Sequence, residues 1–268
     1  MNMLWQRILT AVVGAPLALA AVLAGGGWFF LLIAAVVGLG LWEFYRLAEK
    51  RGVALSPGAL IGLGLAFPLA AHLEENPFPI WLGLLALAVL WEAGRTIFAK
   101  GGGSVLLSSG LAVLGLLYVA GGASLLILLR RASLALAVLA FLLTWVNDTL
   151  AYFVGLSIGK IRLAPAISPR KTVEGMLGGI LGTEVAALLV NQFWLHWPLW
   201  QIGFLGLALA VMAQLGDLVE SAFKREAGIK DSGWVLPGHG GILDRFDGLL
   251  LVSPLVYLLQ QWWGAMLR

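Results

Sequence analysis

Residues 221–247, SAFKREAGIKDSGWVLPGHGGILDRFD, concentrate the side chains that bind phosphates and divalent metals. The charged residues and the histidine of this segment are Lys224, Arg225, Glu226, Lys230, Asp231, His239, Asp244, Arg245 and Asp247. Lysine, arginine and histidine can hold phosphates, and aspartates can hold a metal. Gly238, Gly240 and Gly241 let the backbone approach a ligand closely. Because the rest of the chain is strongly apolar, this cluster indicates a functional site.

Three aspartates have the spacing expected of a metal site. Asp217 lies near the end of an apolar segment, and on a helix it would share a face with Gln214, Glu220 and Ser221. Asp244 and Asp247 are three residues apart, so they too could share a face. Oxygen-only ligands favour Mg²⁺, and we therefore predict Mg²⁺ bound by Asp217, Asp244 and Asp247, with a second metal or a monovalent cation left open. The alternative is that Asp244 and Asp247 cap a helix, with Arg245 as a surface charge.

Two shorter polar segments precede this cluster. The first, SPRKTVEG at residues 168–175, places Arg170 and Lys171 where a helix begins, which predicts an anion site. An ordinary basic loop beside a membrane would have the same composition. The second, NDTLAYFVG at residues 147–155, places Asp148 within an apolar segment. There the alternative is a buried polar contact between helices.

The composition predicts an all-α polytopic integral membrane protein. Of the 268 residues, 60% are hydrophobic and only 12% are charged, with a mean hydropathy of +0.95. A soluble protein carries about 25% charged residues. The chain has no cysteine, which excludes disulfides, thiolate metal sites and a cysteine nucleophile.

Apolar stretches of spanning length predict about nine transmembrane helices. Their approximate ranges are 8–25, 28–47, 55–73, 77–94, 104–129, 132–157, 173–194, 198–222 and 248–266. The first could instead be a cleaved signal peptide, but its long apolar run favours an uncleaved helix. Gly121 and Gly122 interrupt the fifth, which is either one kinked helix or a helix plus a re-entrant piece.

The distribution of basic residues predicts the orientation. With nine spans, fourteen of the 17 Lys and Arg residues fall on one side, and only Arg130, Arg131 and Arg268 fall on the other. Since basic loops collect in the cytoplasm, residues 168–175 and the polar cluster are both expected there. All five aspartates lie after residue 130, so we predict an N-terminal scaffold at 1–130 and a catalytic domain at 131–268.

The spacing S-x3-R-x4-KD-x5-PGHGG-x2-DR-x-D, found here at residues 221–247, resembles the signature of the phosphatidate cytidylyltransferases, also called CDP-diacylglycerol synthases. The segments NDTLAYFVG and SPRKTVEG are similar to two further motifs of that family. The resemblance covers the C-terminal half, whereas residues 1–130 match only in being apolar. Arg170 stands where the family often has lysine, which keeps the charge.

The resemblance implies transfer of CMP from CTP to phosphatidate, giving CDP-diacylglycerol and pyrophosphate at a bacterial inner or plasma membrane. Taken together with the residues singled out above, it gives as expected catalytic residues Asp217, Asp244, Asp247, Lys224, Arg225, Lys230 and Arg245, with the three aspartates holding Mg²⁺. Of these, Asp217 lies outside the motifs that carry the resemblance. The implied substrate-binding residues are Asp148, Ser168, Arg170, Lys171, Thr172, Ser221, Asp231, His239, Gly240 and Gly241. The expected partners are CTP, phosphatidate and the lipid bilayer; a homodimer is left open, and no nucleic acid is expected.

Three other functions share some of these features. A CTP-dependent lipid-alcohol kinase would also need CTP, Mg²⁺ and a lipid, but it would transfer the terminal phosphate. A transporter could use Asp148 and Asp217 as ion sites, although inverted repeats are not visible in the sequence. A CDP-alcohol phosphotransferase would need an aspartate motif beginning D-G-x2-A-R, which this chain lacks.

Overall fold

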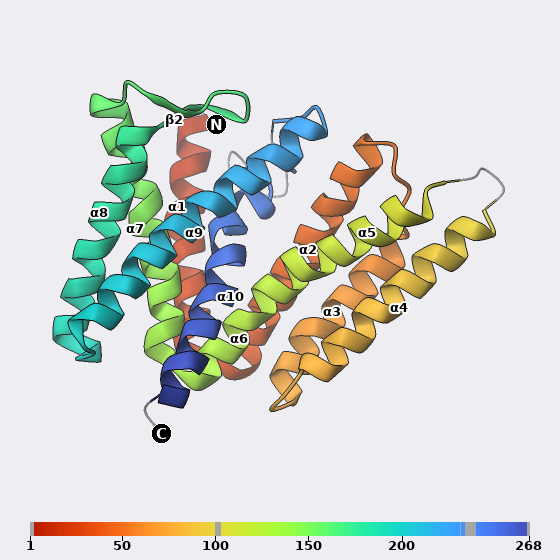
Figure 1. Ribbon diagram of the computed structural model, residues 1–268, viewed down its shortest axis with the longest axis horizontal. Coiled ribbons are helices and arrows are strands. Elements are labelled where there is room, and N and C mark those ends of the chain that lie inside the picture. Colours follow the sequence, from red (N-terminus) through yellow and green to blue (C-terminus); the bar gives the residue numbers. More distant parts are fainter. Residues whose placement is uncertain (1–2, 100–102, 231, 234–239, 267–268) are drawn as a thin grey trace. The chain divides into compact units, whose positions relative to one another are not determined.

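The computed structural model describes residues 3–99, 103–230, 232–233 and 240–266 as a chain of helices with one short hairpin (Figure 1). The helices are α1 (Met3–Ala24), α2 (Gly26–Lys50), α3 (Pro57–Leu73), α4 (Phe78–Ile97), α5 (Val105–Gly115), the π-helical η1 (Leu116–Gly121), α6 (Gly122–Ala132), α7 (Leu134–Ile158), α8 (Val173–Val190), the π-helical η2 (Asn191–Leu195), α9 (Leu199–Glu226) and α10 (Leu243–Met266). The antiparallel strands β1 (Arg162–Ala164) and β2 (Ser168–Thr172) connect α7 to α8.

Each apolar stretch expected to span the membrane is helical. The fifth stretch is one continuous helical run, Val105–Ala132, in which η1 occupies the region of the predicted interruption. The β1–β2 hairpin is a departure from the all-α prediction. The motif at residues 168–172 is therefore a strand, and the helix begins only after it.

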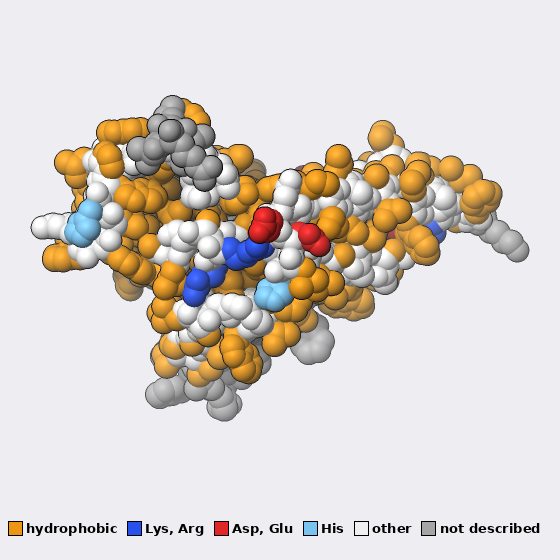
Figure 2. All heavy atoms as spheres, turned by 90° about the horizontal axis from the view of Figure 1, so that it is seen from below, with side chains coloured by type: hydrophobic (Ala, Val, Ile, Leu, Met, Phe, Trp, Pro, Cys, Tyr) orange, Lys and Arg blue, Asp and Glu red, His pale blue; other side chains and the backbone are white. Residues whose placement is uncertain are grey.

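Six helices of the described chain are long and apolar enough to cross a membrane, namely α2, α4, the run from α5 to α6, α7, α8 together with η2, and α9. Residues 12–24 of α1 and all of α3 form shorter apolar helices. The face drawn in Figure 2 is mainly hydrophobic and carries few charged side chains. These features are those of a polytopic membrane protein, while the count of nine spans stays a prediction.

The chain divides into two compact units, which are described separately. The first contains residues 1–128 and 223–245, and its largest fully buried side chains include Phe29, Phe67 and Leu116. The second contains residues 129–222 and 246–268, with Phe141 and Ile202 fully buried. Residues 223–245, which hold most of the polar cluster, therefore belong to the same unit as the N-terminal helices. The division into an N-terminal scaffold at 1–130 and a catalytic domain at 131–268 stays a prediction.

In the second unit, small residues let α8 lie directly against α7. A Cβ at Gly175 would lie 2.6 Å from the Ala151 carbonyl oxygen, and one at Gly179 would lie 2.6 Å from Asn147 Oδ1. Gly178 and Gly182 meet α7 side chains in the same way. Any larger residue on this face of α8 would separate the two helices. The close packing fixes the positions of the polar residues that α7 and α8 carry.

Candidate active site

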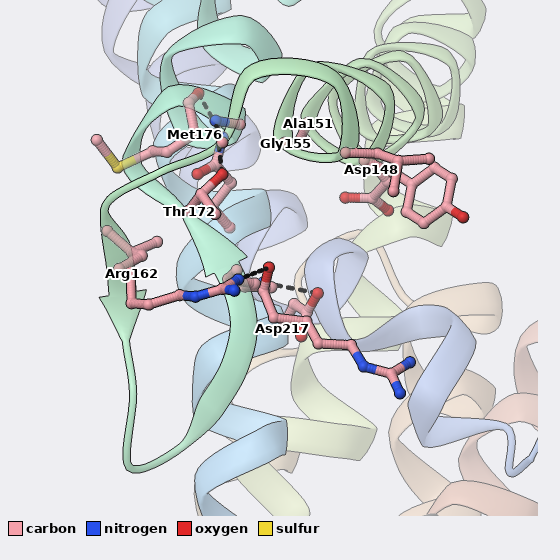
Figure 3. A pocket seen from close by; sticks show the side chains of 15 residues that line it. Asp148, Ala151, Gly155, Arg162, Thr172, Met176 and Asp217 are labelled. Carbon is pink, nitrogen blue, oxygen red and sulfur yellow. Dashed lines mark hydrogen bonds and ion pairs between the residues drawn. The ribbon is translucent and has the colours of Figure 1, made fainter.

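A cavity of about 600 Å³ lies within the second unit and is lined by residues of α7, the β1–β2 hairpin, α8 and α9. Its polar lining consists of Asp148, Arg162, Arg170, Lys171, Thr172, Gln214 and Asp217. Figure 3 shows Arg162 extending from β1 into the space that Thr172 and Asp217 border. Leu156 and Tyr152 add apolar walls and are themselves exposed. The volume suits a small-molecule ligand, and the basic lining suits an anion.

The hairpin positions the basic residues of the cavity. Arg162 pairs with Thr172 across the two strands, so Arg170 and Lys171 lie close to β1. The Thr172 hydroxyl caps α8 by accepting a hydrogen bond from the Gly175 N–H at 3.1 Å. This cap ends β2 and begins α8, and it places Lys171 directly before the start of the helix. The predicted residues Arg170, Lys171 and Thr172 therefore share one cavity, whereas Ser168 begins β2 and is not part of the lining.

An ion pair crosses this cavity between Lys171 and Asp217. Lys171 Nζ lies 2.7 Å from Asp217 Oδ2, and the two side chains are 25% and 37% exposed. The Ser221 hydroxyl donates a hydrogen bond of 3.2 Å to Asp217 Oδ1. Lys171 and Asp217 are 46 residues apart in the sequence, and the fold brings these two charges into contact. Both remain accessible to a ligand.

Two neighbouring residues of α7 have different roles. Asn147 is fully buried, and its Oδ1 accepts a hydrogen bond of 3.0 Å from Gln214 Nε2 of α9. Gln214 Nε2 also donates to the Met176 carbonyl of α8 at 3.1 Å. Asn147 thus makes the buried polar contact that the sequence suggested as an alternative for this motif. Asp148, by contrast, is exposed and lines the cavity.

Carboxylates gather beside Asp217 in the second unit. Asp247 interacts electrostatically with Asp217, Asp148 and Glu220. Among the residues that the structure describes, however, no three Asp, Glu or His side chains are arranged to hold a metal ion by themselves. Mg²⁺ usually takes only one or two carboxylates and fills its other positions with water and phosphate oxygens, so the donor set fits a magnesium ion bound together with a nucleotide.

Asp244 belongs to the first unit and is surrounded by hydrogen-bond donors. Its Oδ1 lies 2.5 Å from Lys224 Nζ, and its Oδ2 accepts from the Gly241 N–H at 2.7 Å and from the Ser232 hydroxyl at 2.9 Å. Gly240 has φ +80°, and a Cβ there would press on Asp244 Oδ2, so this position requires glycine. Burial opposes ionisation of Asp244, but these donors outweigh it and hold the pKa of the carboxyl below its ordinary value.

The remaining predicted site residues either belong to the first unit or lie outside the described residues. Arg225 donates a hydrogen bond of 3.1 Å to the Ile229 carbonyl, while Lys230 and Arg245 are exposed. Asp231 and His239 lie outside the described residues. Because Asp244 is in one unit and Asp217 and Asp247 are in the other, the predicted magnesium site of all three stays a prediction.

Sequence reasoning missed two residues. Arg162 lines the cavity, but it stands outside the motifs and its position on a strand was not predicted. Glu43 is a buried carboxylate of α2, and it contacts Ser232 of the polar cluster at residues 221–247. The sequence did contain a sign of Glu43, because a glutamate within an apolar helix often marks a functional site.

Comparisons with known proteins identify the family of this chain. The model of the cytidylyltransferase family matches residues 5–263. A phosphatidate cytidylyltransferase of Synechocystis sp. is 35% identical over 94% of this chain and 94% of its own length. One from Bacillus subtilis is 39% identical over 95% of this chain and 96% of its own length. One from Staphylococcus saprophyticus is 35% identical over 94% and 97%. The chain therefore belongs to the cytidylyltransferase family.

Proposed function

We propose that this protein is a phosphatidate cytidylyltransferase, which transfers CMP from CTP to phosphatidate and releases pyrophosphate. The observation that carries the proposal is the cavity in which Lys171, Arg162 and Arg170 lie beside the carboxylate of Asp217. Such a lining can receive phosphates and a divalent cation together. The relatives named above act on phosphatidate according to their names, and they match nearly the whole chain.

In the reaction, a phosphate oxygen of phosphatidate attacks the α-phosphorus of CTP, and the bond from that phosphorus to the β-phosphate oxygen breaks. The attacking phosphate is already an anion near neutral pH, so no strong general base is needed. The protein must instead bring two highly charged groups together and neutralise them. Arg162, Arg170 and Lys171 supply positive charge for this purpose, and Asp217 is available to orient a cation.

A magnesium ion, when bound, supplies charge neutralisation for the departing pyrophosphate. We assign Asp217 and Asp247 as its ligands in the second unit and keep Asp244 as a further candidate. Lys224, Arg225, Lys230 and Arg245 are assigned to phosphates of the substrates. The donor arrangement around Asp244 supports a role for that carboxylate, because Lys224, Gly241 and Ser232 hold it in one orientation.

The lipid substrate fits the mixed walls of the cavity. Phosphatidate has an anionic headgroup and apolar tails, so its site must offer charge on one side and open to the bilayer on the other. Arg170 and Lys171 offer the charge, while Leu156 and Tyr152 line the cavity and are exposed at its edge. We therefore assign phosphatidate to the side of the cavity formed by α7 and the hairpin.

The decisive experiment uses purified protein in detergent with phosphatidate, Mg²⁺ and CTP labelled at either the α or the γ phosphate. A cytidylyltransferase moves the α label into the lipid and releases the γ label in pyrophosphate. Transfer of the γ label into the lipid would instead identify a lipid kinase, and this outcome would overturn the proposal.

We also propose that the hairpin faces the cytoplasm, because fourteen of the 17 basic residues fall on its predicted side. The chain has no cysteine, so single cysteines can be introduced without further changes. Ala166 of the hairpin and Ala132 at the end of α6 are both exposed and are predicted to lie on opposite sides. An impermeant thiol reagent added to intact cells should label Ala132→Cys and leave Ala166→Cys unlabelled. The reverse pattern would contradict the orientation.

A further inference from the structure

Glu43 is a buried carboxylate in the C-terminal third of a mainly apolar helix. It lies in α2, and only 2% of its surface is exposed. A carboxylate in such surroundings is costly unless hydrogen-bond donors or a cation compensate it. The hydrogen-bond donors come from the polar cluster at residues 221–247, near the other end of the chain. Glu43 Oε1 accepts from the Ile242 N–H at 2.9 Å, and Oε2 accepts from the Leu243 N–H at 2.9 Å.

These contacts place Glu43 at the N-terminus of α10. The first N–H groups of a helix have no partner within the helix, and a carboxylate there is favoured by both hydrogen bonding and the helix dipole. The cap thus comes from a side chain about 200 residues away along the sequence. Gly233 and Gly241 also come so close that a Cβ at either would overlap the Glu43 carboxylate. Residues 232–233 and 241–243 therefore lie directly against Glu43.

Ser232 connects Glu43 to Asp244. The Ser232 hydroxyl lies 3.1 Å from Glu43 Oε2 and 2.9 Å from Asp244 Oδ2. The Ser232 N–H also donates to Asp244 Oδ2 at 3.1 Å. One hydroxyl hydrogen serves one acceptor at a time, so the two carboxylates share this donor. The position of Asp244 thus depends on Glu43 in two ways, through Ser232 and through the start of α10.

From this network we infer that Glu43 is a positioning residue of the enzyme, which sets the orientation of the Asp244 carboxylate from the N-terminal half of the chain. The inference rests on the proposed function, in which Asp244 is a candidate ligand of Mg²⁺. Residues that orient a metal ligand typically change metal affinity or activity by about 10- to 100-fold when they are replaced.

Glu92 provides a matched control. It lies in α4 of the same unit, it is also only 2% exposed, and it also accepts a backbone hydrogen bond, from the Ser56 N–H at 2.8 Å. Its other partner is Arg95, at 2.7 Å. Neither Ser56 nor Arg95 belongs to the polar cluster at residues 221–247. Glu92→Gln therefore measures the effect of neutralising a buried carboxylate in this unit without disturbing Asp244.

The test compares Glu43→Gln, Glu43→Asp, Ser232→Ala and Glu92→Gln as full-length proteins in detergent. Glu43→Gln keeps the size of the side chain, but it replaces one acceptor oxygen by a donor that would face an N–H group. We expect it to lower kcat by about 10- to 100-fold and to raise the Mg²⁺ concentration for half-maximal activity, while the KM for phosphatidate changes less than about threefold. Glu43→Asp should recover part of kcat, and Ser232→Ala should show a smaller loss of the same kind.

A second readout does not depend on turnover. Addition of Mg²⁺ and CTP should raise the Tm of the wild type and of Glu92→Gln, and this rise should be reduced in Glu43→Gln. If Glu43→Gln does not fold, Glu43→Asp and Ser232→Ala decide the question by the same measurements. The inference is overturned if Glu43→Gln and Glu92→Gln lose the same kcat, or if the variants at Glu43 and Ser232 keep wild-type Mg²⁺ dependence. A wild type that fails to move the α label into the lipid would instead refute the proposed function.

Discussion

Replacing Lys171 by alanine should reduce activity much more than stability. Lys171 Nζ lies 2.7 Å from Asp217 Oδ2, with the side chains 25% and 37% exposed. At this separation two unit charges attract by about 6 kcal/mol for an effective dielectric constant of about 20. Solvent screening and the loss of hydration offset most of that attraction, and partly exposed pairs stabilise proteins by about 1 kcal/mol or less. We therefore expect the free energy of unfolding to fall by no more than about 1 kcal/mol.

The expected effect on turnover is larger because Lys171 lines the cavity that we propose as the site of phosphate transfer. Removing one such donor typically lowers kcat by about 10²- to 10³-fold. The assay measures kcat and the KM values for CTP and phosphatidate in mixed micelles, together with Tm. Lys160→Ala is the matched control, since Lys160 is exposed close to the hairpin but does not line the cavity.

Two results would refute this reasoning. If Lys171→Ala kept kcat within about threefold of the wild type, or lost no more than Lys160→Ala, the ion pair would be structural. If Lys171→Ala changed only the dependence on CTP, the basic residues of the hairpin would serve the nucleotide, and the assignment of phosphatidate to that side of the cavity would be wrong.

Three further predictions follow from the second unit. Asp217→Asn should abolish turnover while the protein still folds, since charge on oxygen is what Mg²⁺ requires; near-normal activity at saturating Mg²⁺ would remove Asp217 from the metal site. Arg162→Ala should raise the KM for one of the anionic substrates by about 10-fold or more, because a hydrogen bond to a charged group contributes about 1.5–3 kcal/mol. Unchanged KM values would exclude Arg162 from substrate binding. Gly179→Ala should lower stability by about 1–3 kcal/mol, measured as a fall in Tm, because the added methyl group would press on Asn147 Oδ1 and Gln214 Nε2; an unchanged Tm would show that α7 and α8 can separate at no cost.

The helices were predictable from the sequence because membrane spans depend on one strong signal. Long apolar runs such as 173–194 and 198–222 correspond closely to α8 with η2 and to α9. The β1–β2 hairpin was missed because its residues have a charged, loop-like composition, and only the pairing of Arg162 with Thr172 makes it a strand. Short strands depend on their neighbours more than on their own sequence.

The candidate site was predicted in part. Residues chosen for their chemistry, among them Asp148, Lys171 and Asp217, do line one cavity. Arg162 was missed because a single arginine in a loop has no spacing that distinguishes it from an ordinary basic residue at the membrane surface. The contact between Glu43 and the start of α10 joins distant parts of the chain, and no local pattern contains that information.

The ion pair between Lys171 and Asp217 also means that an anionic ligand and a metal ion affect each other's binding. A phosphate that takes Lys171 away from Asp217 leaves a carboxylate without its cation, and a metal that takes Asp217 leaves a lysine without its anion. Each ligand therefore removes the penalty that the other would meet, which is positive thermodynamic coupling. Because such coupling is reciprocal, phosphatidate should bind more tightly when magnesium and nucleotide are present, and magnesium with nucleotide should bind more tightly when phosphatidate is present.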